Sequence, residues 1–319
     1  MKQTMMALAV LLNTCLFSSC AIGIGPNSSH ANYSQKSAEH GATADAIERS
    51  LSVQPFTAIA CNLPAAVTYV QTNDQAPRGV LKGTPAMVDG CIVDVRNGEL
   101  QLRLARSGKR GFRDLFQPRE KLQIVVYGGR LTALEVHSAC TFYAEQLETA
   151  QLTLTNSGAS NIKVDRLVGQ RLTMSCSGAS STKLAGSVDK LTLSVTGASS
   201  LVAYEFTAQD LTVKVSGAST AKLLVQRSAD AHVSGASTLA LQGAADLFTI
   251  KCAGASTVKA ADLKAQNVVA DVSGASGVKC YAARSIKGSV GCGSLTYGGH
   301  PTSFNVERQS SIASIKAVD

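Results

Sequence analysis

Hydrophobic and polar residues alternate along the second half of the chain, in short runs that recur at a nearly constant spacing. In residues 211–215, apolar side chains at Leu211, Val213 and Val215 enclose the polar Thr212 and Lys214. A period of two places successive side chains on opposite faces of a strand, so one face is buried and the other faces water. The pattern predicts short, half-buried strands and no long helix.

The triplet Gly-Ala-Ser separates these strands and occurs seven times, eighteen to twenty residues apart. A fixed period of about twenty residues that holds strands and turns is typical of a β-solenoid, in which each repeat stacks on the one before. The triplets would then form a column of corners, with Gly for a positive φ, Ala where the next coil is close, and Ser to satisfy corner amides. The predicted corner glycines are Gly158, Gly178, Gly197, Gly217, Gly235, Gly254 and Gly274.

The column extends beyond the literal triplet. Ser138-Ala139-Cys140 stands twenty residues before the first copy, and Ser294 and Ser314 continue the column after the last one. We therefore predict an all-β fold, a parallel β-helix of about 19–20 residues per coil, with regular coils over residues 138–319. Residues 51–137 hold strand-like runs without the triplet, and we expect irregular β coils there that cap the N-terminal end.

The N-terminus has the layout of an export signal. Residues 1–20 carry Lys2, an apolar run too short for a membrane span, and two serines directly before Cys20. This end resembles the lipobox of bacterial lipoproteins and predicts lipidation at Cys20, although Phe17 departs from the usual pattern. Simple cleavage nearby is the alternative. Residues 21–50 are rich in Gly, Ser and Asn without apolar periodicity, and we expect a flexible tether.

These features together resemble the auto-transporter adhesin head GIN domain family. The resemblance rests on the seven triplets, on the run NGELQLRL at residues 97–104 and on the export signal, and it covers about residues 51–319. It implies a right-handed parallel β-helix that Gram-negative bacteria export, with an adhesin-like role in the cell envelope. It supplies no catalytic residues.

Positive charge is the strongest candidate for binding chemistry in a chain of net charge +8. Five of the seven triplets carry a lysine three residues after the Ser, and residues 106–121 form a second basic cluster. Such surfaces fit an anionic polysaccharide, lipopolysaccharide phosphates or an acidic partner. Alternatively, the lysines keep the sheet solvated and discourage association between sheets. The candidate ligand-binding residues are Lys163, Lys183, Lys222, Lys259, Lys279, Arg110 and Arg113. Nucleic acid is disfavoured because aromatic residues do not alternate with the basic ones.

Catalytic chemistry has little support in the sequence. Acidic residues fall at scattered positions of the repeat and do not converge on one face, and His137 and His232 are expected to point outward without partners. We therefore predict a protein that is not an enzyme and needs no cofactor or metal. Two alternatives to a glycan-binding or surface-binding module stay open: a scaffold or spacer at the outer membrane, and a carbohydrate-active enzyme.

The cysteines fall into two groups. Cys176, Cys252 and Cys280 occupy core positions of the repeat and are expected to act as small hydrophobic residues. Cys61 and Cys91 lie in the capping region and could pair in an oxidising compartment. With the export signal, these features predict an outer-membrane-anchored lipoprotein of the cell envelope. The sequence leaves open which side of that membrane it faces and its oligomeric state.

Overall fold

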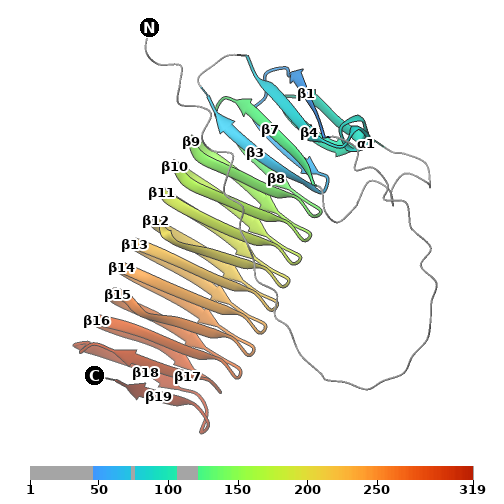
Figure 1. Cartoon of the computed structure of the whole chain (residues 1–319). Helices are drawn as coiled ribbons and strands as arrows, with labels where there is room; N and C mark the ends of the chain where they lie inside the picture. Colours follow the sequence, from blue (N-terminus) through green and yellow to red (C-terminus); the bar gives the residue numbers. More distant parts are fainter. Residues whose placement is uncertain (1–45, 73–75, 106–120, 319) are drawn as a thin grey trace, which may run out of the picture. The chain divides into compact units, whose positions relative to one another are not determined.

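The computed structural model describes residues 46–72, 76–105 and 121–318. Eight long strands stack in parallel and form a β-solenoid of about nine turns, as Figure 1 shows. This confirms the predicted all-β, parallel solenoid. The eight strands are β9 (Thr141–Asn156), β10 (Asn161–Cys176), β11 (Ser181–Val195), β12 (Ser200–Val215), β13 (Thr220–Val233), β14 (Thr238–Cys252), β15 (Thr257–Val272) and β16 (Gly277–Val290). The export signal with Cys20, most of the predicted tether and the basic residues 106–120 lie outside the described residues.

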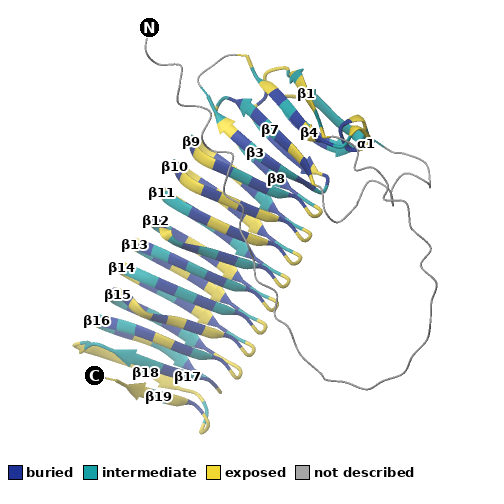
Figure 2. Cartoon of the chain, viewed as in Figure 1, coloured by how far each residue is buried: buried dark blue, intermediate teal, exposed yellow. Residues whose placement is uncertain are grey.

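Each long strand doubles back on itself. β10 starts directly after one corner and ends directly before the next, and these corners stack on each other through backbone hydrogen bonds. The strand therefore forms one wall of the solenoid with its first half and the opposite wall with its second half (Figure 1). The pairing register of β10 with β11 shifts between Val164 and Leu167, within the middle part of the strand. Inward residues alternate with outward ones along both walls, which gives the banded burial of Figure 2.

The corners explain why the triplet repeats. All seven glycines adopt a positive φ, and a Cβ on Gly217 would lie 2.5 Å from the carbonyl oxygen of Gly197 in the coil before. The amide of Ala218 donates to that same oxygen at 2.8 Å. Only a glycine fits because both the dihedral angle and the stacking distance exclude a side chain.

Two of the predicted corner roles were wrong. The alanines of the triplets are exposed, so the close approach between coils occurs at Gly and not at Ala. The serines are buried, and their hydroxyls donate to carbonyl oxygens instead of accepting from amides. Ser219 bonds Ser216 of its own corner at 2.8 Å and Gly197 of the preceding coil at 3.2 Å. The amides of Ser216 and Ala218 already donate to carbonyl oxygens of the preceding coil, whereas a carbonyl oxygen has two lone pairs and can accept a hydroxyl as well.

The column also differs from prediction at its C-terminal end. Ser138-Ala139-Cys140 forms a corner as predicted, since Thr141 pairs with Asn161 directly after both corners. In contrast, Ser294 pairs with Gly277 and not with the corner position, and Ser314 pairs with Ser294. The corner between β16 and β17 (Ser294–Gly298) holds three residues instead of four, which moves Ser294 into the strand.

The N-terminal strands close the solenoid less regularly. β2 (Ala58–Asn62), β3 (Ala65–Gln71) and β8 (Ala133–Val136) join the parallel ladder. β7 (Leu122–Gly128) pairs in parallel with β3 and antiparallel with β4 (Arg78–Gly83), and β4 pairs antiparallel with β1 (Ile47–Ser52). A hairpin of β5 (Cys91–Arg96) and β6 (Glu99–Leu104) follows the short helix α1 (Pro85–Gly90).

The strand β1 overlaps the last four residues of the predicted tether at 21–50, so that boundary was set too late. Ile47 and Leu51 pack against the core, and β1 is held by its pairing with β4. Only two apolar residues mark this strand, too few for an alternating pattern.

At the other end, β18 (Ser303–Arg308) and β19 (Ser314–Ala317) form the last coil, and most of their side chains are exposed.

The core cysteines were predicted correctly. Cys176, Cys252 and Cys280 are each at most 2% exposed, and burial raises the pKa of the Cys280 thiol to about 12. A neutral thiol of this kind packs as a small apolar group. The Cys61 and Cys91 thiols are both free.

Candidate functional site

The five predicted lysines of the repeat lie at one register position on the outer surface of the first wall. Lys163 pairs with Lys183, and Lys259 pairs with Lys279. Lys222 stands midway, two coils from Lys183 and two from Lys259, which is about 10 Å at the spacing of neighbouring strands. We call this line of residues the lysine row. It consists of Tyr143, Lys163, Lys183, Val202, Lys222, Ala240, Lys259, Lys279, Thr296 and Lys316.

Sequence reasoning missed the two ends of this row. Lys316 belongs to it because Thr296 pairs with Lys279 and with Lys316. The corner before Ser294 is one residue shorter than the others. As a result, Lys316 follows Ser314 by two residues, whereas the other lysines of the row follow their Ser by three. Tyr143 occupies the same position in β9 and could have been found by counting from Cys140. The lysine row therefore carries six lysines, one more than the sequence predicted.

The N-terminal end of the row holds a small ionic cluster. Asp165 accepts from the Tyr143 hydroxyl at 2.8 Å and lies 2.9 Å from the Lys163 ammonium nitrogen. Partial burial favours a higher pKa of Asp165, but the hydrogen bonds from Lys163 and Tyr143 and the charge of Lys183 outweigh it and lower the pKa. Burial, together with Asp165, raises the pKa of Tyr143 to about 12. Lys163 is thus partly neutralised, whereas the other lysines of the row have no ion-pair partner within 4.0 Å among the described residues.

Aromatic rings accompany two of these lysines. The Lys163 nitrogen lies 5.2 Å from the ring centre of Tyr143, and the Lys222 nitrogen lies 6.0 Å from that of Tyr204. A tyrosine beside a lysine offers a flat apolar surface next to a charge. A sugar ring with an acidic substituent could contact both groups.

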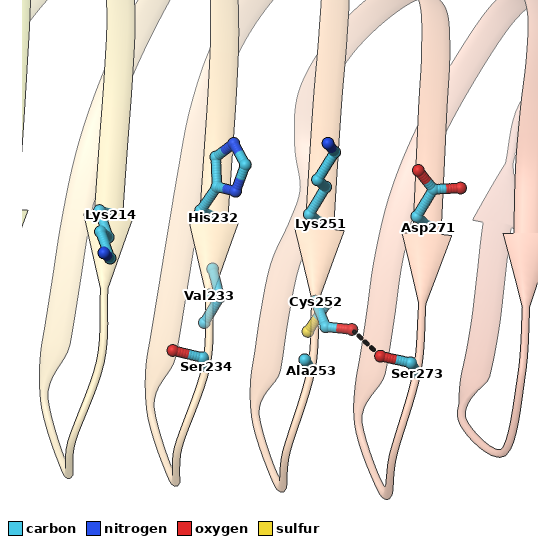
Figure 3. Close-up of a pocket in the computed structure, with 9 residues that line it drawn as sticks. All are labelled: Lys214, His232, Val233, Ser234, Lys251, Cys252, Ala253, Asp271 and Ser273. Carbon is cyan, nitrogen blue, oxygen red and sulfur yellow. Dashed lines mark hydrogen bonds between the residues drawn. The ribbon is translucent and has the colours of Figure 1, made fainter.

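The opposite wall carries charges of both signs. Figure 3 shows Lys214, His232, Lys251 and Asp271 side by side on β12 to β15, around a depression of about 330 Å³. The floor contains Val233 and Cys252. Asp230 lies 3.7 Å from His232, so a second carboxylate besides Asp271 lies close to this depression. This depression is less suited to a purely anionic ligand than the lysine row.

The prediction that His137 and His232 lack partners was wrong. In addition to the contact between His232 and Asp230, His137 contacts the Ser157 hydroxyl in the next coil and lies 3.3 Å from a Glu135 carboxylate oxygen on its own strand. A carboxylate, an imidazole and a hydroxyl in line are the groups of a serine hydrolase. However, the amides of Ser157 and residue 159 already donate to carbonyl oxygens of the preceding coil, so they are not free to stabilise an oxyanion.

The remaining predicted residues have no described geometry. Arg110 and Arg113 lie within residues 106–120, outside the part of the chain that the structure describes. In the described part, no helix is long and apolar enough to cross a membrane. Within the same residues, no group of three or more His, Cys, Asp or Glu side chains gathers as a metal site would require.

Comparison with known families decides the identity of this scaffold. A family model described as "Putative auto-transporter adhesin, head GIN domain" matches residues 55–241 and 232–301, most of the solenoid. The chain belongs to this family. The resemblance expected from the triplets and from residues 97–104 is thereby confirmed. Membership in the GIN domain family indicates an extracellular or envelope-associated protein of adhesin type.

Solved structures similar to this GIN domain protein have low sequence identity to it. A protein titled putative adhesin from Bacteroides fragilis is 20% identical, with 86% of this chain and 97% of that chain covered and a TM-score of 0.42. A putative lipid binding protein from Parabacteroides distasonis is 18% identical, with 87% and 98% covered and a TM-score of 0.48. A putative adhesin from Parabacteroides merdae is 15% identical, with 88% and 98% covered and a TM-score of 0.49. No curated protein matches the chain.

Proposed function

We propose that this GIN domain protein is a non-enzymatic lipoprotein of the cell envelope that binds a linear acidic polysaccharide along the lysine row. The observation that carries the proposal is the shared register of Lys163, Lys183, Lys222, Lys259 and Lys279 on one wall. The spacing is set by backbone hydrogen bonds between coils, so the charges are held in line before a ligand arrives. Binding a polymer then costs little ordering of the protein.

The charge of the surroundings supports an anionic partner. Asp165, which pairs with Lys163, lies at the N-terminal end of the row. Among the described residues, the middle and C-terminal lysines have no such carboxylate partner within 4.0 Å. A row of like charges attracts a polymer of opposite charge more strongly than it attracts single ions, because several contacts form at once.

The proposal predicts that reversing three lysines of the row abolishes polysaccharide binding. We expect the triple variant Lys183→Glu, Lys222→Glu, Lys259→Glu to bind immobilised polygalacturonate at least about 100-fold more weakly, at roughly 1 kcal/mol for each reversed charge. Neutral dextran serves as the probe for charge-independent binding. Affinity of the unaltered protein should fall as salt is added, since exposed charges are screened.

A matched control distinguishes the effect of the lysine row on binding from the effect of net charge. The variant Lys190→Glu, Lys214→Glu, Lys251→Glu makes the same change in net charge on the opposite wall, and we expect it to keep most of the binding. Equal losses in the two triple variants would show that only net charge matters and would refute a site on the row. No binding of polygalacturonate by the unaltered protein would instead favour the scaffold role.

Lipid anchoring makes a separate prediction. Cys20→Ser should move the protein from the membrane fraction to the soluble fraction, because the acyl chains that hold it there require the Cys20 thiol. Cys15→Ser, five residues earlier in the export signal, is the control and should stay with the membrane. If both variants remain membrane-bound, lipidation at Cys20 is wrong. Protease added to intact cells and then to permeabilised cells would show which side of the membrane the solenoid faces.

A further inference from the structure

We propose that Cys61 and Cys140 are a disulfide-forming pair that ties the N-terminal strand β2 to the first regular corner of the solenoid. The proposal rests on the export assumed in the proposed function, because only an oxidising compartment would keep such a bond. It replaces the pairing of Cys61 with Cys91 that the sequence left open.

The stacking geometry of the corners brings these two residues together. In three later corners the Ser hydroxyl donates to the carbonyl oxygen of the residue that ends the strand of the preceding coil. These bonds run from Ser160 to Val136, from Ser180 to Asn156 and from Ser276 to Cys252, each at 3.3 Å. A corner side chain at this position therefore lies on top of the strand end one coil below.

Cys140 and Cys61 occupy these two positions. Cys140 takes the place of the corner Ser, directly before Thr141, which pairs with Asn161 on one side and Ala66 on the other. Cys61 pairs with Val136, the last residue of β8, and so holds the corresponding position one coil below. The two cysteines are far apart in sequence only because an irregular segment is inserted between these coils.

The two cysteines are both enclosed in the core at these stacked positions. Both residues are 0% exposed. The neighbouring Cys140 side chain, followed by burial, raises the pKa of the Cys61 thiol well above its ordinary value. Two buried thiols at these stacked positions are placed to form a disulfide. As buried neutral thiols they would react slowly in the folded state, so pairing is expected while the first coils close.

The chemistry requires an external disulfide, such as that of a thiol oxidoreductase or of glutathione. The thiolate of one cysteine, having lost its proton, attacks this disulfide and releases one external thiolate. The thiolate of the second cysteine then attacks the mixed disulfide, which forms the Cys61–Cys140 bond and releases the other external thiol. Two protons and two electrons leave the protein, and the external disulfide is reduced to two thiols.

The first experiment uses purified full-length protein that has been unfolded, reduced and refolded with oxidised glutathione. Peptide mapping without reductant should find the peptides of Cys61 and Cys140 joined and lighter by two hydrogens than their sum. Reductant should lower the melting temperature by roughly 5–10 °C, since the bond closes a loop of about 80 residues. The same mapping is then made on protein taken from the cell envelope.

Two variants test the assignment without emptying the core. Cys140→Ser and Cys61→Val introduce residues that other coils carry at the same positions, such as Ser160 and Val136, so both should fold. Their melting temperatures should no longer respond to reductant. Free thiols at both positions after refolding, or a bond to another cysteine, would overturn the proposal. A bond that forms on refolding but is absent from cells would confirm the pair and count against export.

Discussion

Replacing Gly217 by Ala should destabilise the solenoid by about 3 kcal/mol or more, far beyond the usual cost of a surface substitution. A Cβ at this position would lie 2.5 Å from the carbonyl oxygen and 2.9 Å from the amide nitrogen of Gly197. These are backbone atoms of the stacked coil and cannot rotate away. The residue also has a φ of +81°, which a side chain disfavours. Urea denaturation followed by circular dichroism would measure the loss.

Gly98 provides the control for this prediction. It has a φ of +76° in the turn between β5 and β6, but no atom lies within 4 Å of where its Cβ would be. Gly98→Ala therefore carries only the dihedral cost, about 1 kcal/mol. If Gly217→Ala costs no more than Gly98→Ala, close stacking of the corners does not explain the repeated glycine.

Phe248→Ala should cost about 3–5 kcal/mol, as expected for a large buried aromatic side chain. Phe248 is 0% exposed, and it lies in a register row that runs through Val268 and Ile286 to Phe304. Its removal would leave a cavity that the rigid coils above and below cannot close. The melting temperature and the urea midpoint of the variant report the effect.

Phe304 is the matched control because it has the same side chain in the same row. It lies in the last coil, where it is 45% exposed. With one side of the ring in water, Phe304→Ala should cost about 1 kcal/mol or less. Equal costs at the two positions would mean that the C-terminal coil is covered in solution to the same extent as the interior.

The rigidity that these two predictions probe also bears on binding. The lysines of the row are attached to strands whose spacing the stacked corners fix. A destabilised corner next to Lys222 should therefore weaken polysaccharide binding only when the coils separate, whereas charge reversal acts with the fold intact. Measuring binding and unfolding on the same variants distinguishes these two effects.

The sequence alone determined the repeat, and with it the greater part of the fold. In a solenoid, residues one period apart become neighbours, so counting from Gly217 or Lys222 predicts spatial rows directly. The corner column and the row of five lysines follow from this single property. The burial of Cys176 and Cys252 follows as well, because their parity in the strand sets the face.

Counting residues along the repeat did not predict the structure where the length of a coil changes or where strands pair outside the repeat. The short corner before Ser294 displaced Lys316 from its expected position, and β1 depends on an antiparallel partner that no period reveals. Only the tertiary structure placed Cys61 against Cys140, because the irregular strands between them break the repeat. It also decided that the corner serines donate to carbonyl oxygens, because the stacking of one coil on the next determines which backbone groups each hydroxyl can reach.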